Sequence, residues 1–307
     1  MIKIKHILAI LAIALITASC IRDETEDCLE GKYICFESIM KKYDYRDIVN
    51  NVDLFLYNES GKLVSHYSYL RQDLHGEDYM AFVPMHPAGN YTAVAVINNS
   101  DDYVITGMDR IETFDVFLKT DTGDTLKHKQ ADIYQGLEQI EFIERKNSIV
   151  DYDTLNFWKN TNHFYVTINY SGYEIPEGAT LTAYIQGNNG QTDYRNDCPA
   201  ECLRVYEPHE ETYPTYFVFT THKLWTKMDL QLIVRVENSD GTGFEHRISV
   251  AEALATNYLP DRIYDTDEKI WQEDEYYLSL KIGKLFALIS INSIDWSVVG
   301  PPPIIIG

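Results

Sequence analysis

The stretch Val52-Asp-Leu-Phe-Leu-Tyr57 is a short apolar run of strand-favouring residues, and it decides the fold class of this 307-residue chain. It leads directly into Asn58-Glu-Ser-Gly61, a cluster of turn-forming residues. Short strand-like runs bounded by such clusters are typical of β-hairpins. We therefore predict a hairpin whose return strand extends from Lys62 to Leu70.

The same alternation of short strand and turn recurs around this hairpin. Two prolines and a glycine in Pro84-Met-His-Pro-Ala-Gly-Asn90 enforce a bend between two strand-like runs. Several short strands at close spacing, with turn signals between them, predict a β-sandwich. The runs that we assign as strands around the hairpin are Lys32 to Phe36, Tyr79 to Val83, Tyr91 to Ile97 and Asp115 to Leu118.

The second half of the chain predicts a second sandwich. Phe164, Val166, Ile168 and Tyr170 recur with a period of two, which places them on one face of a strand. A content of 23 tyrosines, with many Val, Ile and Thr, also favours pleated surfaces over helices. The further strands that we predict are Thr180 to Gln186, Thr215 to Thr221, Met228 to Val236, Phe244 to Val250, Tyr276 to Ile282 and Leu285 to Val299, with one short helix from Val250 to Tyr258.

The strand pattern weakens between about Gln130 and Asn156, and we place a domain boundary near Asp153. The fold class that we predict is all-β, with two tandem β-sandwich domains and at most short helices. The predicted segments are a signal peptide at 1–19, an acidic tether at 20–31, an N-terminal sandwich at 32–153, and a C-terminal sandwich with a proline-rich tail at 154–307.

The first twenty residues have the architecture of an export signal. Lys3 and Lys5 form a positive start, Ile7 to Ile16 is an apolar run, and Thr17-Ala-Ser19 supplies small residues before Cys20. The segment resembles the lipobox of bacterial lipoproteins, which implies that Cys20 becomes the first mature residue and carries acyl chains. The alternatives are a plain signal peptide or a membrane helix. The apolar run falls short of the roughly 20 residues that span a bilayer.

The segment after Cys20 is acidic, and so is the whole chain. Asp23, Glu24, Glu26 and Asp27 follow within seven residues and predict a solvated tether that an anionic membrane surface does not attract. The formal charge of the chain is −21, and removal of Lys3 and Lys5 makes it more negative. Nucleic-acid affinity depends on Lys and Arg that neutralise phosphates, so we expect no nucleic-acid partner.

Four cysteines remain if Cys20 is acylated, namely Cys28, Cys35, Cys198 and Cys202. An even number in an exported chain permits one or two disulfides, such as Cys28–Cys35 and Cys198–Cys202. The spacing proves neither pair, and free buried thiols are the alternative. No histidine cluster lies beside either pair, so zinc is disfavoured and we expect no metal.

The chain ends in Gly300-Pro-Pro-Pro-Ile-Ile-Ile-Gly307, a stiff spacer followed by a β-prone tip. The segment formed by Pro301, Pro302, Pro303, Ile304, Ile305 and Ile306 is a candidate donor strand for the open sheet edge of another subunit. A frayed tail or a last strand within its own domain is an equal alternative.

Signatures of enzymes are missing from the sequence. No Gly-Xaa-Ser-Xaa-Gly, His-Glu-Xaa-Xaa-His, Walker loop or dinucleotide glycine fingerprint occurs. His209-Glu-Glu211 and the acidic pairs Asp101-Asp102 and Asp121 with Asp124 carry ligating atoms but lack the spacing of a metal site. We therefore expect no catalytic residues and no cofactor. A glycosidase-like pair of carboxylates is brought together only by the fold, so the sequence does not exclude it.

Several of these features together resemble the fimbrial anchor and minor-subunit lipoproteins of Bacteroidetes. These features are the lipobox, the acidic tether and the stretches Val52 to Leu63, Pro87 to Tyr91, Asp132 to Gly136 and Ile291 to Trp296. The acidic tether also resembles the surface-export signal of that group. The resemblance implies two transthyretin-like sandwiches and an outer-membrane surface lipoprotein without enzymatic activity.

The same resemblance implies the partners of the chain, which are fimbrial stalk or tip subunits held through β-strands, and the outer membrane held through the lipid. Stalk subunits of the group are cut after a basic residue in a leading strand. Arg46 lies where such a cut could fall, although anchors need no cut.

A rival hypothesis is a surface glycan-binding lipoprotein or adhesin. Trp158, Trp225, Trp271 and Trp296 would supply stacking platforms for sugars, but widely spaced tryptophans also serve as core or edge residues.

Overall fold

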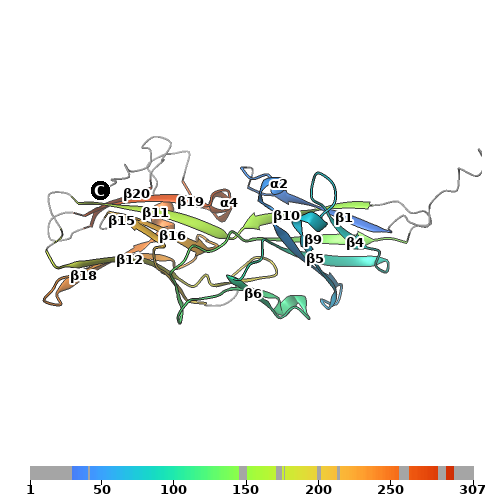
Figure 1. Ribbon diagram of the computed structural model, residues 1–307, viewed down its shortest axis with the longest axis horizontal. Helices are drawn as coiled ribbons and strands as arrows, with labels where there is room; N and C mark the ends of the chain where they lie inside the picture. The colour runs from blue at the N-terminus through green and yellow to red at the C-terminus, as the bar shows by residue number, and fades with distance from the viewer. Residues whose placement is uncertain are drawn as a thin grey trace, which may run out of the picture.

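The computed structural model describes residues 30–40, 42–144, 151–170, 175, 177–198, 202–212, 215–255, 263–282 and 288–293, with the backbone alone for 288–293. The described residues are mostly strands arranged in several sheets, which confirms the predicted all-β sandwich class (Figure 1). The α-helices among them are short, and they are α2 (Tyr45–Ile48), α3 (Val250–Ala255) and α4 (Asp267–Trp271).

The first lobe is one seven-stranded sheet. Its strands are β1 (Gly31–Ser38), β2 (Asn51–Asn58), β3 (Leu63–Leu70), β4 (Ala81–Pro84), β5 (Gly89–Ile97), β9 (Tyr134–Phe142) and β10 (Asp151–Lys159). They are hydrogen-bonded in the order β3-β2-β5-β9-β10-β1-β4. The pairing of β2 with β3 confirms the predicted hairpin.

This sheet folds over on itself to make a sandwich. β9 and β10 pair only from Phe157 opposite Gly136 to Lys159 opposite Tyr134, so the sheet turns at this short contact. Side chains from the two halves of the sheet, such as Ile34 and Phe157 from one and Leu54 and Ala95 from the other, share one buried cluster. The core of the first lobe therefore lies between the two halves of a single sheet.

The second lobe is built from two five-stranded sheets. One has the order β15-β16-β11-β19-β20 and the other β18-β17-β12-β14-β8. Phe164, Phe217 and Leu278 from the first of these sheets share a buried cluster with Ile185 and Val234 from the second. The bounds of the strands are β8 (Thr125–Leu126), β11 (Thr161–Tyr170), β12 (Thr180–Gly187), β14 (Arg204–Tyr206), β15 (Glu210–Thr212), β16 (Tyr216–His222), β17 (Gln231–Glu237), β18 (Gly243–Ser249), β19 (Glu275–Ile282) and β20 (Leu288–Ser293).

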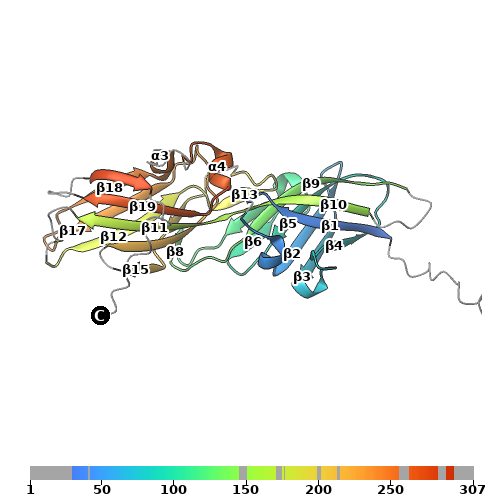
Figure 2. The same cartoon turned by 90° about the horizontal axis from the view of Figure 1, so that it is seen from above.

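One continuous stretch of chain joins the lobes. β10 ends at Lys159, β11 begins at Thr161, and the two follow one line along the molecule with Asn160 between them (Figure 2). The predicted boundary between residues 153 and 154 falls inside β10, which pairs with β1 in the first lobe. The stretch with the weak sequence pattern contains β9 and most of β10, and the chain enters the second lobe only after Asn160.

Strands from the first half of the sequence also pair with strands from the second half. β6 (Tyr103–Thr106), β7 (Asp115–Leu118) and β13 (Gln191–Asp193) form a small sheet in which β7 from the first half of the sequence pairs with β13 from the second half. β8 pairs in parallel with β14 of the second lobe. The buried cluster of the second lobe therefore extends through Phe114 and Val116 to Phe55 on the first sheet.

Gly136 allows β9 to approach β10 closely where the two strands pair. A Cβ atom at this position would lie 2.3 Å from Cδ2 of Leu155 and 2.5 Å from the carbonyl oxygen of Asn156. Such distances require the backbone to shift. We predict that Gly136→Ala lowers the free energy of unfolding by about 1–3 kcal/mol, the usual cost of overpacking, as measured by chemical denaturation. Val64→Ala on the exposed face of β3 is the control, and an equal loss in both variants would contradict the prediction.

Candidate functional site: the leading strand and the lobe junction

β1 is the first strand after the predicted acidic tether, and we call it the leading strand. It lies between β10, with which it is parallel, and β4, with which it is antiparallel. Nζ of Lys32 lies 2.9 Å from Asp151 and 2.7 Å from Asp153, both on β10. Burial alone would lower the pKa of Lys32, but the two carboxylates raise it above its ordinary value. These ion pairs fix the start of the leading strand to β10.

The segment after the leading strand contacts the second lobe. The hydroxyl of Tyr43 donates to Asp274 at 2.6 Å, and the ammonium of Lys42 pairs with both Asp274 and Glu273. Asp274 is 1% exposed and also accepts from Lys159, the last residue of β10, at 2.5 Å. Burial alone would raise the pKa of Asp274, but Lys159 and Lys42 hold it below its ordinary value. We call Lys42, Tyr43, Lys159 and Asp274 the junction clamp.

The junction clamp extends toward the first lobe through Asp132. The carboxylate of Asp132 lies 3.0 Å from Nζ of Lys159 and 3.3 Å from Nε2 of His163 on β11. Lys159 is therefore placed between two carboxylates, one from each side of the junction. Each buried charge of this network has an opposite partner, as buried charges require.

Three of the four tryptophans surround a buried lysine at the same junction. Nζ of Lys223 lies 5.6, 5.2 and 4.4 Å from the ring centroids of Trp158, Trp225 and Trp271, and it donates to the carbonyl of Asn196 at 3.1 Å. Lys223 is 2% exposed. Each of these rings therefore lies against the amine of Lys223, and the three tryptophans are half-buried, so their use as platforms for sugars stays a prediction. The fourth, Trp296, lies outside the described residues.

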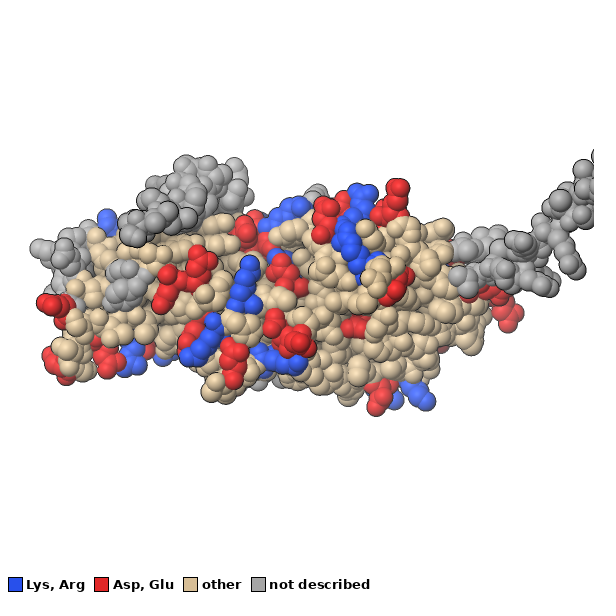
Figure 3. Space-filling view, viewed as in Figure 1, with Lys and Arg blue, Asp and Glu red and all other residues tan. Residues whose placement is uncertain are grey.

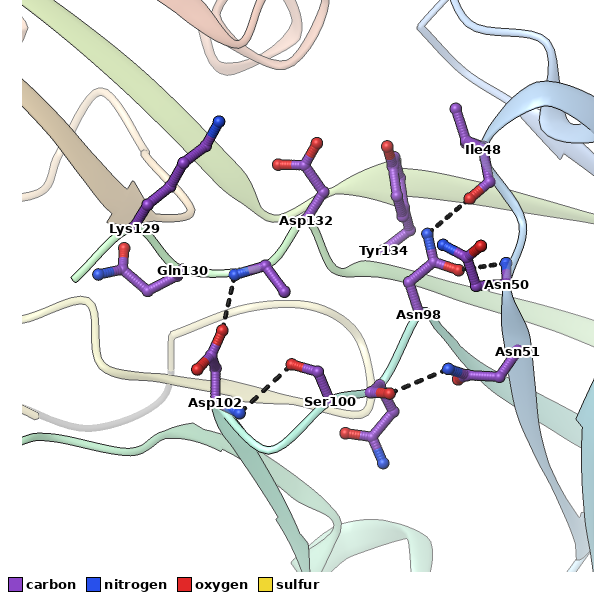
Figure 4. A pocket seen from close by; sticks show the side chains of 12 residues that line it. Ile48, Asn50, Asn51, Asn98, Ser100, Asp102, Lys129, Gln130, Asp132 and Tyr134 are labelled. Atoms are coloured by element: carbon purple, nitrogen blue, oxygen red, sulfur yellow. Dashed lines mark hydrogen bonds between the residues drawn. The ribbon is translucent and has the colours of Figure 1, made fainter. Parts of the chain in front are cut away.

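A cleft of about 570 Å³ opens beside the junction clamp (Figure 4). Its walls come from the start of β2, the loop after β5 and the segment that leads into β9. The lining is mostly amide, hydroxyl and carboxylate side chains, and Tyr134 supplies an aromatic ring. Sequence reasoning did not find this cleft, because its residues are far apart along the chain.

The cysteines singled out from the sequence are spread over the structure. Cys35 lies in the leading strand with a free thiol, and burial raises its pKa. Cys202 also has a free thiol, while Sγ of Cys198 donates to the carbonyl of Asn188 at 3.0 Å. The described Cys198 and Cys202 therefore share no disulfide. Cys28 lies outside the described residues, so the Cys28–Cys35 pair stays a prediction.

Two further predicted sites, Cys20 and the segment 301–306, also lie outside the described residues. Arg46 is on α2, exposed, and pairs with Asp44 and Asp78. Its carbonyl accepts from Arg71 at 2.6 Å, and the chain before it is held by the junction clamp.

The ligating residues noted in the sequence have other partners. Nε2 of His209 lies 2.9 Å from the hydroxyl of Thr220, and Asp121 accepts from the ring of His128. Across the described ranges, no group of three His, Cys, Asp or Glu side chains is arranged to hold a metal ion. No helix in those ranges is both long and apolar enough to cross a bilayer. On the face shown in Figure 3, acidic and basic side chains are interspersed.

The described residues define a two-lobed protein of the β-sandwich class, with buried ion pairs at the junction of the lobes. A family model then identifies the kind of structural protein. The chain belongs to the family of fimbrillin-A associated anchor proteins Mfa1 and Mfa2, whose model matches residues 25–300. This is a family of fimbrial proteins and is not a family of enzymes, and the match confirms the family resemblance found in the sequence.

Solved structures share the fold. A candidate polysaccharide-binding protein from Bacteroides thetaiotaomicron has a TM-score of 0.74 at 16% identity, over 87% of this chain and 96% of that chain. A candidate adhesin from the same organism has a TM-score of 0.71 at 19% identity, over 88% and 97%. The fimbrial anchor protein Mfa2 from Porphyromonas gingivalis has a TM-score of 0.67 at 16% identity, over 87% and 97%. No curated protein matches in sequence.

The junction clamp gives a stability prediction. Asp274→Ala leaves Lys159, whose side chain is 3% exposed, with one of its two carboxylates, and removal of one partner from a buried ion pair is strongly destabilising. We expect a loss of about 3 kcal/mol in chemical denaturation. The matched control is Asp265→Ala, which removes an exposed pair with Lys269 and should leave the stability nearly unchanged. Equal effects of the two substitutions would argue against the clamp.

Lys223 gives a prediction about pH. Burial lowers the pKa of Lys223 from 10.5 to about 7, although the tryptophan faces favour its charged form. At a pH between these two pKa values, Lys223 is protonated in the unfolded chain and largely deprotonated in the folded one, so the unfolded chain binds more protons. The contribution of Lys223 to the free energy of unfolding therefore rises with pH, by up to about 1.4 kcal/mol per pH unit. We predict that the difference between wild type and Lys223→Met changes in this direction from pH 7 to pH 9.5 in urea titrations, at roughly this slope or less. A difference that does not vary with pH would refute it.

Proposed function

We propose that this chain is an outer-membrane surface lipoprotein that anchors or assembles a fimbrium. In this proposal the chain is exported by residues 1–19, acylated at Cys20 and carried to the outer face of the membrane with the acidic segment as a tether. Two or more acyl chains would give a stable attachment, whereas one chain gives marginal binding. The family match over residues 25–300 is the observation that carries the proposal.

The geometry of the leading strand supports an anchoring role. The strand that follows the tether is held on both sides by β10 and β4 and by the ion pairs of Lys32. The junction clamp then ties the next segment to the second lobe. An anchor that keeps its leading strand in place remains one covalent piece from the lipid to the second lobe, and it needs no cut at Arg46.

Contacts with stalk or tip subunits would use β-strands. The edge strand β3 presents an open edge with Val64 and Leu70, which are 39% and 55% exposed. Strand addition at such an edge is a common mode of recognition. The segment 301–306 remains our candidate for a strand donated to the adjoining subunit.

We predict that Cys20→Ala moves the protein from the membrane fraction to the soluble fraction and releases fimbriae into the culture medium, because the acylated residue is lost. Fractionation with immunoblotting and electron microscopy of the cells measure both effects. Cys202→Ala, which removes a thiol of the second lobe, is the matched control and should leave both unchanged. Retention of the Cys20→Ala protein in the membrane fraction would count against acylation at this residue.

A further inference from the structure

Four ring-bearing side chains form a row on the outer face of the first lobe. The ring of Tyr152 on β10 stacks on that of Tyr33 on the leading strand, with their centroids 5.6 Å apart. The ring of Tyr33 also lies 5.2 Å from those of Phe82 on β4 and His75. Ile34, the next residue of the leading strand, belongs to the core, so Tyr33 faces outward. We call Tyr33, His75, Phe82 and Tyr152 the aromatic row.

The aromatic row lies at the end of the first lobe where the predicted tether enters. β10 reaches the second lobe at Lys159, so its start, with Tyr152, lies at the opposite end of the first lobe (Figures 1 and 2). At this end the backbone of Met85 donates to the carbonyl of Glu30, directly before the leading strand, at 3.0 Å. The side chains of Tyr152 and Met85 are 58% and 40% exposed. Exposed aromatic and apolar groups therefore meet at the tether end of the lobe.

The same face becomes charged toward the second lobe. Alternate residues of a strand share one side, so Tyr33 is followed on this face by Cys35 and Glu37. Glu37 lines a pocket with four more charged side chains, which are Lys42, Asp44, Arg46 and Asp78. Charged groups are costly to move out of water. A medium less polar than water therefore accepts only the tether end of this face.

The charges at the tether end define which surface can contact it. β9 runs away from the junction of the lobes, so Glu141 and Glu144 lie at the same end as Glu30, and all three are exposed. Exposed carboxylates are not attracted to an anionic membrane. Tyrosine rings with polar hydroxyls are enriched at the boundary between the hydrocarbon and the headgroups of a bilayer. Together these features fit a zwitterionic lipid surface.

The length of the tether keeps this end of the lobe near the membrane. Cys20 precedes Gly31, the first residue of β1, by eleven positions. A fully extended chain of that length spans at most about 40 Å. Encounters between the aromatic row and the bilayer are then intramolecular, with an effective concentration of about millimolar order. A contact too weak to hold a free protein on a membrane is sufficient under this condition.

We propose that the aromatic row, together with Met85, is a membrane-contact surface that rests in the interfacial layer of a zwitterionic lipid bilayer. The charged part of the same face stays in water, so the contact directs the second lobe away from the membrane. This inference rests on the proposed attachment at Cys20 and adds a second, non-covalent contact to it.

The test measures hydroxyl-radical oxidation of single side chains by mass spectrometry. The acylated full chain, reconstituted on phosphatidylcholine vesicles, is compared with the Cys20→Ala protein in solution. Met85 is matched with Met108, which is 37% exposed and follows β6 of the small sheet. Tyr152 is matched with Leu70, which is 55% exposed at the end of β3 nearer the junction of the lobes. Each side chain is compared with itself in the two samples.

We expect oxidation of Met85 and Tyr152 to fall at least about threefold on the vesicles, which corresponds to a tethered contact formed for roughly two thirds of the time. Oxidation of Met108 and Leu70 should stay unchanged. Phosphatidylglycerol vesicles should protect Met85 and Tyr152 less, because of the exposed carboxylates. The proposal is overturned if all four side chains respond alike, if phosphatidylglycerol protects better, or if Met85 and Tyr152 become protected without lipid as the protein concentration rises, which would assign the row to contact between copies of the chain.

A substitution in the row supplies a second readout. Tyr152→Asp places a charge in the contact and should return the oxidation of Met85 to its rate in solution, whereas Leu70→Asp should leave Met85 protected. Where circular dichroism shows that Tyr152→Asp does not fold, Met85→Asp read at Tyr152 takes its place. Persistent protection in the folded row variant would overturn the proposal.

A separate arm distinguishes this inference from the proposed lipid anchor. Failure of the wild-type protein to float with the vesicles would count against acylation. The same oxidation measurement is therefore also made on residues 21–307 held by an N-terminal hexahistidine on phosphatidylcholine vesicles that contain a nickel-chelating lipid. Protection of Met85 and Tyr152 there supports the contact surface whether or not Cys20 is acylated, and its absence overturns it.

Discussion

The whole structure depends on one uninterrupted path of chain through both lobes. β10 and β11 are separated by a single residue, Asn160, so neither lobe can turn far without disturbing strand pairing in the other. Each of these strands has a parallel neighbour, β1 in the first lobe and β19 in the second. Parallel pairing requires a long crossover connection. The leading strand can therefore join β10 only because the rest of the first lobe is inserted between them along the sequence.

This path makes the junction polar. At Lys159, Asn160 and Thr161 the chain is buried, and many of the buried polar groups there pair with one another, although Oδ1 of Asn160 has no partner among the described residues. The amide of Asn160 donates to Asn196, and the hydroxyl of Thr161 accepts from the backbone of Ile133. An apolar junction would hold the lobes with less directional preference. Hydrogen bonds and ion pairs instead restrict the lobes to one relative orientation.

Local patterns predicted much of the fold and little of the site. The alternation in Phe164 to Tyr170 and the turn at Asn58 to Gly61 are properties of neighbouring residues, so the strands around them were predicted correctly. β9 lies in the stretch where the strand pattern weakens, because Gly136 and the polar residues after it obscure the pattern where the sheet turns. Lys223 and Asp274 carried no sequence signal, since the partners of each come from distant segments. The tryptophans were noticed, but the lysine that they enclose was not.

The parallel pairing of β1 with β10 has a mechanical consequence. A pull on the N-terminal end of β1 and an opposing pull through the C-terminal end of β10 into β11 act along the strands, while the hydrogen bonds between the strands run across them. Such a force loads all these bonds together in shear, whereas an antiparallel pair pulled from the same ends would open one bond at a time. Resistance to traction would then come from the direction in which two strands run, independently of how tightly either lobe is packed.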